Sequence, residues 1–300
     1  MDPMQQNGPA PRIFDRALMR RRMARARRGQ PETFLLERAV EDLCERLGAV
    51  LRPFPRVLDA GTPTPALAAA LARLSEQRAI TRLAPLDEPD DPRWRTVVGD
   101  EEALPFAAES FELVVSALAL QSVNDLPGTL IQMRRALAPD GLLMACLLGG
   151  QTLRELREAF ATAEEELTGG VSPRVAPFAD VRDLGALLQR AGLALPVTDV
   201  DTVTVRYADM FGLLRDLRAM GATNALNERL RRPLPRALLM RAAQAYAERF
   251  SDTDGRVRAT FEIIWLSGWA PHDSQQKPLA PGSAKMRLAD ALGAQEQKLR

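Results

Sequence analysis

The sequence predicts an α/β fold with a doubly wound, mostly parallel sheet of seven strands and helical cap insertions. The first observation is a regular alternation of short apolar runs with helical segments between residues 56 and 148. The second is a later pair of strand-like segments, separated by a helical block, which would add an antiparallel edge. The third is the composition of the 300 residues, 46% apolar and 26% charged, which is typical of a globular protein with a sizeable core.

The N-terminal residues 1–30 predict a basic helix or arm. Seven arginines and no acid lie between Arg16 and Arg28, and Ile13, Phe14, Leu18 and Met19 are spaced as in a docked amphipathic helix. No apolar core of a secretory signal precedes them, and although an arginine-rich start is also found in mitochondrial presequences, three prolines come before it. We favour a solvated structural helix over a targeting or membrane-surface device.

The first half of the chain alternates between helical and strand patterns. A helix is predicted after Pro31, ending near Gly48, because apolar residues recur at helical spacing. The next elements are predicted as a strand at 56–60, a helix at 67–74, strands at 79–84 and 96–98, a buried strand at 111–116, a helix at 127–137 and a strand at 141–148. The segment 139–141, Pro-Asp-Gly, is expected to stop the last helix and turn the chain.

The second half has longer elements. They are predicted as helices at 152–167 and 179–191, a strand at 195–207, a polar-rich helical stretch at 210–250 and a last strand at 258–269. We therefore expect one domain over residues 31–272, with helical insertions at about 151–178 and 209–250. Residues 273–300 are rich in Gln, Pro, Gly, Ala and Lys and are expected to form a flexible tail.

The composition excludes several function classes. Net charge is only +1, so no overall field attracts nucleic acid. Cys44 and Cys146 are too few for a disulfide framework or a cysteine-rich metal site, and the single histidine, His272, argues against a Ser-His-Asp triad or a histidine-ligated zinc. The longest apolar run is about ten residues, short of the ~20 that span a bilayer. We expect a cytoplasmic protein without a metal site, a nucleic-acid partner or a transmembrane segment.

Four segments together resemble one fold family. The predicted first strand ends in Val57-Leu58-Asp59-Ala60-Gly61, and the acidic turn Gly99-Asp100-Glu101 precedes Leu104-Pro105-Phe106. Segments 110–117 and 137–143 take the places of a fourth and a fifth strand. These features resemble the class I S-adenosylmethionine-dependent methyltransferases. The resemblance implies S-adenosylmethionine as cofactor at the carboxyl edge of the sheet, with cofactor-binding residues Asp59, Gly61, Asp100, Glu101 and Ser116.

Some of these residues have a structural alternative. Asp59 could lie at the ligand edge or cap the helix that follows it. Asp100 could accept a hydrogen bond from the adenine amino group or only close its turn, and Glu101 is expected to line the pocket. On a later helix, Glu155 and Arg157 are expected on a solvated ion-pair face rather than at a substrate.

Further motifs narrow the resemblance to one branch. They are Ile13-Phe14-Asp15-Arg16 and the segments 123–127, 149–157, 172–178, 183–192 and 217–224. These are similar to the respiratory complex I assembly factors of mitochondria and alphaproteobacteria, which are related to malonyl-carrier-protein O-methyltransferases. The resemblance covers about residues 12–285 and implies arginine hydroxylation of a complex I subunit, which is then the expected partner. Arg174, in the retained loop 172–178, is the predicted substrate-binding residue.

The glycine loop departs from the family pattern Asp-x-Gly-x-Gly-x-Gly. This chain has Asp59 and Gly61, but Pro63 and Pro65 stand at the next two glycine positions. Proline fixes φ near −65° and has no N–H, so it cannot copy a left-handed glycine. The loop is therefore expected to be reshaped, at a cost to cofactor affinity.

Two further elements of the same pocket also differ. The family places an acid at the end of the second strand, whereas this chain has Leu83-Ala84-Pro85, with Asp87 and Glu88 the nearest acids. Where the branch has Leu-His-Trp after the fourth strand, this chain has Leu120-Gln121-Ser122. Together these changes predict that S-adenosylmethionine binding is weakened or abandoned.

Two functions remain open. The first is an S-adenosylmethionine-dependent enzyme of complex I assembly that acts on a protein substrate, with a degenerate cofactor loop and no catalytic residue assigned. The second is a non-catalytic scaffold or chaperone that binds a complex I subunit or another assembly factor. Hydroxylation would need an oxidant, and one histidine cannot build a two-histidine iron site. A nicotinamide-dependent oxidoreductase is disfavoured because the Gly-x-Gly-x-x-Gly fingerprint is absent.

Overall fold

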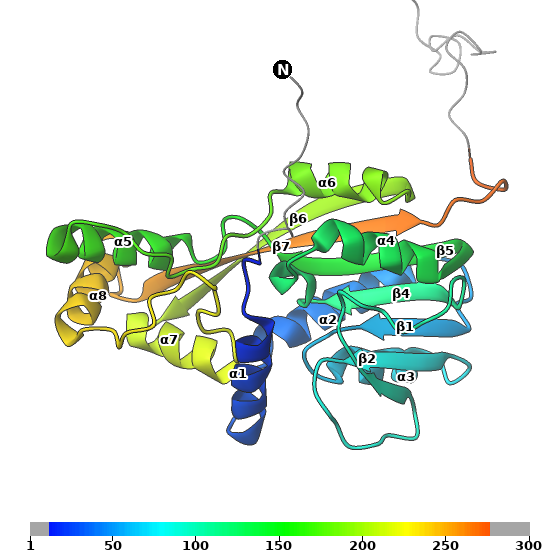
Figure 1. Ribbon diagram of the computed structural model, residues 1–300, viewed down its shortest axis with the longest axis horizontal. Helices are drawn as coiled ribbons and strands as arrows, with labels where there is room; N and C mark the ends of the chain where they lie inside the picture. The colour runs from blue at the N-terminus through cyan, green and yellow to red at the C-terminus, as the bar shows by residue number, and fades with distance from the viewer. Residues whose placement is uncertain (1–11, 277–300) are drawn as a thin grey trace, which may run out of the picture.

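Seven strands form one sheet in the order β3-β2-β1-β4-β5-β7-β6. The computed structural model describes residues 12–276. Strands β1 to β5 pair in parallel, and β7 pairs antiparallel with both β5 and β6 (Figure 1). The strands are β1 (Arg56–Ala60), β2 (Ala79–Ala84), β3 (Arg95–Val98), β4 (Phe111–Ala117), β5 (Leu137–Leu148), β6 (Ala194–Tyr207) and β7 (Val257–Trp269). The predicted fold class, with its antiparallel edge, is confirmed.

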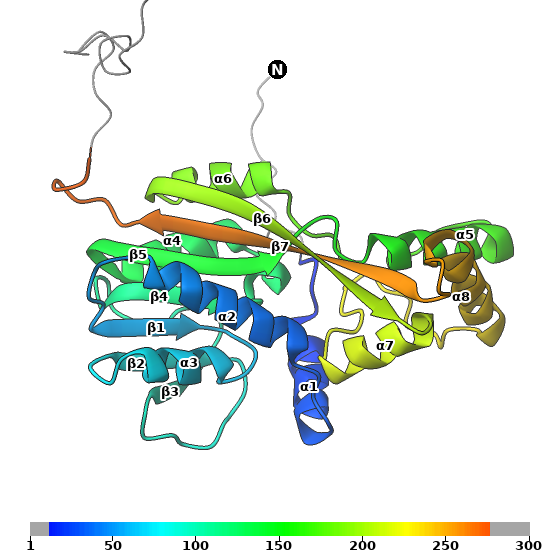
Figure 2. The ribbon, with the colours of Figure 1, turned by 180° about the vertical axis from the view of Figure 1, so that it is seen from behind.

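Helices cover both faces of the sheet. α4 and α6 pack on one face, and α2 and α3 pack on the other (Figures 1 and 2). The helices are α1 (Arg16–Arg28), α2 (Phe34–Gly48), α3 (Ala66–Leu74), α4 (Leu126–Ala136), α5 (Arg154–Thr168), α6 (Val181–Arg190), α7 (Met210–Ala219) and α8 (Arg236–Phe250). Strands β1 and β4 are buried along nearly their whole length, which explains why most of their residues are apolar.

Strands β6 and β7 run beyond β5 and carry a cap made of α5, α7 and α8 (Figures 1 and 2). The hydroxyl of Tyr246 in α8 donates to the carbonyl of Arg258 in β7 at 2.7 Å, which ties the cap to the strand. α1 lies between the carboxyl edge of the parallel strands and α7 (Figure 1). The cap and α1 together therefore cover the carboxyl edge of the parallel strands, which is the edge at which open α/β sheets bind ligands.

Two predicted segments differ from the structure. The stretch 210–250 is not continuously helical, because Gly221 turns the chain with a φ of +73° after α7, and Pro233 and Pro235 lie before α8. The expected turn at 139–141 is instead an irregularity inside β5, where Asp140 has a φ of +62°. The pairing register of β5 with β4 shifts at the same place.

Glu155 is not solvent-exposed as expected. It is 3% exposed, and its carboxylate accepts hydrogen bonds from the N–H and the hydroxyl of Thr260 in β7. A polar residue on a helix face can thus be buried when the facing strand supplies donors. Arg157 reaches the carbonyls of Thr152 and Ala176 rather than an acid.

Residues 277–300, most of the predicted tail, lie outside the described part of the chain. Within residues 12–276, none of the helices combines the length and the apolar character needed to cross a lipid bilayer.

Candidate functional site

The loop after β1 contacts the acidic turn after β3 through Gly61 and Glu101. Gly61 has a φ of +78°, a conformation that favours glycine. A Cβ atom added to Gly61 would lie 2.3 Å from the Glu101 side chain. The Glu101 side chain therefore fills the space next to this glycine.

Beneath the loop, Asp59 of β1 is fully buried and paired with Arg82 of β2. Nη1 of Arg82 lies 2.6 Å from Oδ2 of Asp59, and the hydroxyl of Thr62 donates to the other carboxylate oxygen. Arg82 also lies 2.8 Å from Glu88. Burial opposes the charge of Arg82, but Asp59 and Glu88 outweigh it and raise its pKa. Asp59 does not cap α3, because Pro65 stands at that N-cap position.

The two prolines shape the segment between Gly61 and α3. Pro65 has a φ of −71°, and the carbonyl of Pro63 accepts a hydrogen bond from Arg27 of α1. Because proline has no N–H, the four residues 62–65 offer backbone donors only at the two threonines. The loop is consequently poorer in donors for a ligand than a glycine-rich loop of the same length.

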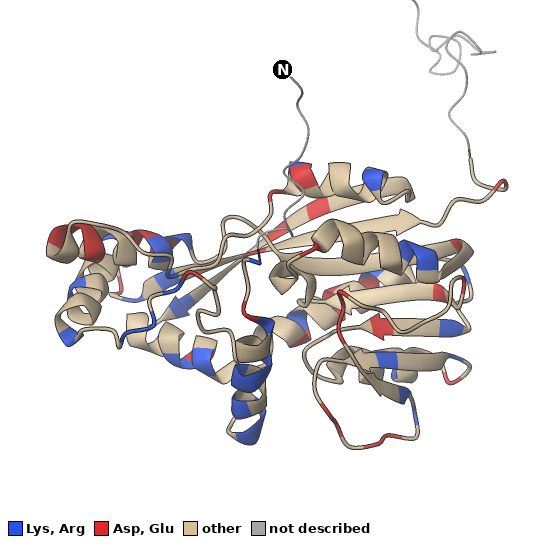
Figure 3. Cartoon of the chain, in the orientation of Figure 1, with Lys and Arg blue, Asp and Glu red and all other residues tan. Residues whose placement is uncertain are grey.

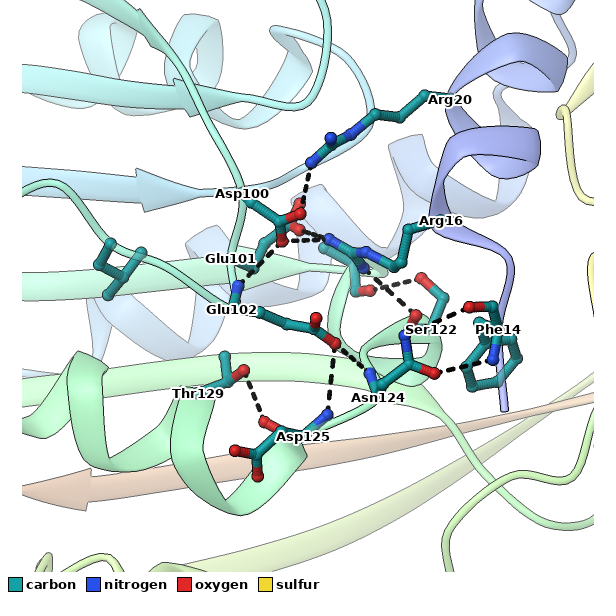
Figure 4. Close-up of polar contacts among 12 residues, drawn as sticks. Phe14, Arg16, Arg20, Asp100, Glu101, Glu102, Ser122, Asn124, Asp125 and Thr129 are labelled. Atoms are coloured by element: carbon teal, nitrogen blue, oxygen red, sulfur yellow. Dashed lines mark hydrogen bonds and ion pairs between the residues drawn. The ribbon is translucent and has the colours of Figure 1, made fainter. Parts of the chain in front are cut away.

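Arginines of α1 engage the acidic turn (Figure 4). Nη2 of Arg16 lies 2.6 Å from Oδ1 of Asp100 and also pairs with Glu101. Nη1 of Arg16 donates to the carbonyl of Ser122 at 3.2 Å. Arg20 reaches the other oxygen of Asp100 at 2.6 Å. Burial opposes ionisation of Asp100, but a backbone N–H and the two arginines outweigh it and lower its pKa.

Glu88, in the loop after β2, receives a third arginine of α1. Nη2 of Arg27 lies 2.9 Å from Oε1 of Glu88, whose side chain is 5% exposed. Of the two acids predicted near the end of the second strand, Glu88 is thus the one seen to meet α1. Its pKa is lowered, since Arg82 and Arg27 outweigh the opposing effect of burial.

A cavity of about 410 Å³ lies between this edge, α1 and the cap. Glu101 and Arg174 contribute charged groups to its lining. Its walls are mainly apolar and include Met19 and Met23 of α1, Leu36 of α2, Phe160 of α5 and Leu217 of α7. An apolar cavity with a few charged groups at the carboxyl edge of a parallel sheet is a typical ligand site.

The predicted site residues occupy three kinds of position. Gly61, Glu101 and Arg174 line the cavity. Asp59 and Ser116 lie beneath it, fully buried, and the hydroxyl of Ser116 donates to the carbonyl of Ala60 at 2.7 Å. Asp100 takes part in the ion pairs at the edge, and it also accepts from the N–H of Glu102 as a turn acid does. Arg174 itself is paired with Glu164 and lies over the Phe160 ring, 5.8 Å from its centroid.

The arginines that meet these acids were not predicted from the sequence as site residues: they are Arg16, Arg20, Arg27 and Arg82. No residue of α1 is fully buried, and Arg16, Arg20 and Arg27 of this helix pair with acids of the sheet edge rather than only with solvent. Phe14, which precedes α1, is buried and pairs with Leu226. A signal existed for Arg82, because an arginine within an apolar strand needs a buried acidic partner.

In the positions seen here, the side chains of Asp59, Asp100 and Glu101 do not fit S-adenosylmethionine in the way that the resemblance to the methyltransferases implies. Glu101 fills the space next to Gly61, and Asp59 is engaged by Arg82. Asp100 and Glu101 are both engaged by Arg16.

Comparisons with known proteins agree with this architecture. A family model described as a methyltransferase domain matches residues 58–145. The chain is 38% identical over 287 residues to the arginine-hydroxylase NDUFAF5 of Danio rerio mitochondria, covering 93% of this chain and 89% of that protein. The human protein of the same name is also 38% identical, over 288 residues, with 93% and 83% covered.

Bacterial relatives and solved structures extend the likeness. The malonyl-[acyl-carrier protein] O-methyltransferase of Gallionella capsiferriformans is 33% identical over 278 residues, covering 86% of this chain and 92% of that enzyme. The crystal structure of a putative methyltransferase from Bacillus halodurans superposes with a TM-score of 0.53 at 16% identity, covering 78% of this chain and 99% of that one. At this identity the structural likeness concerns the fold alone.

Proposed function

This chain belongs to the methyltransferase-domain family that contains the NDUFAF5 arginine-hydroxylases and the malonyl-[acyl-carrier protein] O-methyltransferases, and from that membership we propose that it acts on a protein substrate in respiratory complex I assembly. The similarity to NDUFAF5 runs through 93% of the chain, so it includes the cap as well as the sheet. The expected partner is a complex I subunit.

One observation carries the proposal. Two of the segments that hold the branch motifs, 172–178 and 217–224, line the cavity at the carboxyl edge, where they contribute Arg174 and Asn224. Residues that distinguish a branch and line its ligand cavity are suited to select the substrate of that branch. The apolar walls favour a buried side chain of the substrate over a free polar metabolite.

We infer further that the cofactor loop is degenerate. Pro63 and Pro65 remove the φ freedom and the N–H donors that the glycine pattern supplies. The Asp59–Arg82 pair and the position of Glu101 next to Gly61 support the same inference. We assign no catalytic step to S-adenosylmethionine in this chain.

The proposed function is tested by looking for modified side chains in the complex I subunits. Complex I subunits are isolated from cells with and without this chain, and their peptides are compared by mass spectrometry. We expect one side chain to be covalently modified only when the chain is present. Normal complex I assembly without the chain, together with unmodified subunits in both strains, would reject the proposal.

A non-catalytic scaffold is the second candidate, and the ion pairs that fill the edge favour it. Titration calorimetry with S-adenosylmethionine and S-adenosylhomocysteine separates the two. Binding in the micromolar range supports an enzyme that uses this cofactor. No binding at about millimolar ligand, with a complex I subunit still captured by the tagged chain and left unmodified, supports the scaffold. The predicted place of action, the cytoplasm and the inner-membrane periphery reached through the partner, stays a prediction.

A further inference from the structure

Helix α1 contacts the sheet edge mainly through its arginines. None of its residues is fully buried, and basic side chains occur along its whole length (Figure 3). Three arginines pair with three carboxylates of the sheet edge, Glu88, Asp100 and Glu101. Arg22 instead donates to the carbonyls of Thr223 and Asn224. The surface under α1 is thus one that binds guanidinium groups.

The acceptors around Arg16 suit a guanidinium better than an ammonium. One nitrogen of Arg16 contacts both Asp100 and Glu101, and the other donates to the carbonyl of Ser122 (Figure 4). A planar fork with several N–H groups can satisfy these three acceptors together, whereas the compact ammonium of lysine presents a point charge.

Glu101 makes this position one that needs a cation. Glu101 is 3% exposed, and its carboxylate pairs with Arg16. Removing one partner of a buried ion pair leaves an uncompensated charge, which is strongly unfavourable. If Arg16 leaves, another cation is favoured in its place.

The cavity between the sheet edge, α1 and the cap extends from the position of the Arg16 side chain. Glu101 and Arg16 both line it, and Met19 and Met23 of α1 form part of its wall. A displacement of α1 would therefore free the guanidinium position and open the apolar cavity beside it. A peptide could place an arginine in the first and its neighbouring apolar residues in the second.

We propose that Asp100, Glu101 and the carbonyl of Ser122 form a binding site for an arginine side chain of another protein, and that Arg16 and Arg20 of α1 occupy this site in the resting chain. The inference rests on the proposed function, since it takes the ligand to be a segment of the protein substrate. It assigns the residues that recognise that segment, and it makes α1 an internal competitor.

The test measures binding of a fluorescein-labelled decapeptide with a single arginine among alanine, leucine and glycine, and of the same peptide with lysine. The full chain is compared with R16Q/R20Q and with the control R21Q/R25Q. The control removes the same charge from the same helix at two exposed positions. We expect R16Q/R20Q to bind the arginine peptide about tenfold more tightly than wild type, because the competing arginines are gone. The control should bind as wild type does, and the lysine peptide should bind more weakly to every variant.

Adding D100N/E101Q to R16Q/R20Q should abolish binding of the arginine peptide. Equal affinities of R16Q/R20Q and the control, or equal affinities for arginine and lysine peptides, would overturn the site. If R16Q/R20Q does not fold, hydrogen–deuterium exchange of the wild-type chain decides. The arginine peptide should then accelerate exchange in residues 16–28, and unchanged exchange at saturating peptide would overturn the proposal.

Failure of the guanidinium site can be distinguished from failure of the proposed function. If these peptide experiments fail while subunits are still modified in cells, the guanidinium site is wrong and the proposed function stands. If the peptide binds as expected while subunits are unmodified in both strains, the site stands and the proposed activity is wrong.

Discussion

At the scale of single residues, the buried ion pair of Arg82 and Asp59 supports the loop that follows β1. Both side chains are fully buried, and Arg82 also hydrogen-bonds the carbonyl of Thr62 at 2.7 Å. A buried pair adds little net stability compared with a well-packed apolar pair, but loss of one partner leaves a charge without compensation. Its effect is therefore seen most clearly when one partner is removed.

We expect R82L to lower the free energy of unfolding by about 3–5 kcal/mol, since Asp59 is left buried and unpaired. The control R93L removes an exposed arginine paired with Asp91 and should cost no more than about 1 kcal/mol. Urea denaturation followed by circular dichroism measures both. The double variant D59L/R82L should lose less than R82L alone, and a larger loss would contradict the pairing argument.

The two prolines of the loop give a second prediction at this scale. P63G/P65G should bind S-adenosylmethionine at least about tenfold more tightly than wild type, because the loop regains φ freedom and two N–H donors. The control P53G/P55G makes the same replacements at two exposed positions just before β1. Titration calorimetry provides the comparison. Unchanged affinity would show that the prolines do not limit the pocket.

At the scale of elements, α1 and α8 are attached in different ways. Both are basic, but α8 fully buries Leu238, Ala242, Ala245 and Tyr246, whereas no residue of α1 is fully buried. Apolar burial is insensitive to simple salt at moderate concentration, whereas pairing between partly exposed charges weakens as salt screens it. The two helices should therefore respond differently to ionic strength.

We expect about 1 M sodium chloride to increase tryptic cleavage within residues 16–28 several-fold relative to low salt. Cleavage within residues 236–250 should hardly change. Limited proteolysis with peptide mass mapping compares the two helices in one digest, so any effect of salt on trypsin itself cancels. Equal responses of both helices would show that ion pairs do not hold α1.

At the scale of the whole molecule, the cysteines and tyrosines make stability fall in alkali. Burial raises the pKa of Cys146 to about 12, and burial also raises the pKa values of Cys44, Tyr207 and Tyr246. These are all the cysteines and tyrosines of the chain. In the unfolded chain the same groups lose their protons at ordinary values, so between about pH 9 and pH 12 the unfolded state binds fewer protons than the folded one.

The free energy of unfolding should therefore decrease steadily as pH rises above about 9. Denaturant unfolding at a series of pH values measures the decrease, and tyrosinate absorbance reports when the phenols ionise. Both tyrosines should ionise together with unfolding rather than before it. Ionisation of a tyrosine in the folded chain near pH 10 would contradict its buried state.

The order and type of most elements could be predicted because their signals are local. Strands 56–60 and 79–84 have the predicted bounds, and the helices after Pro31 and before residue 137 are placed within a few residues. The bulge at Asp140 was missed because a Pro-Asp-Gly segment has the composition of a free turn. Pairing with β4 on either side of the bulge and backbone hydrogen bonds to Ala270 keep it in the strand.

The candidate site could be predicted only in part. The two acids after β3 and the glycine after β1 could be located from their motifs, as could the loop of Arg174. The arginines that pair with these acids could not be predicted, because Arg16 pairs with acids 84 and 85 positions away in the sequence. No periodicity or spacing relates residues so far apart.

The sequence by itself thus determined the alternation of strands and helices and the parallel sheet that they form. Hydrophobic periodicity and turn chemistry act over a few residues, so they can be read along the chain. Only the tertiary structure decided that α1 lies over the carboxyl edge of this sheet and that its arginines engage the acids there. Ion pairs depend on which charges folding brings together and removes from water, and that is a property of the packed molecule.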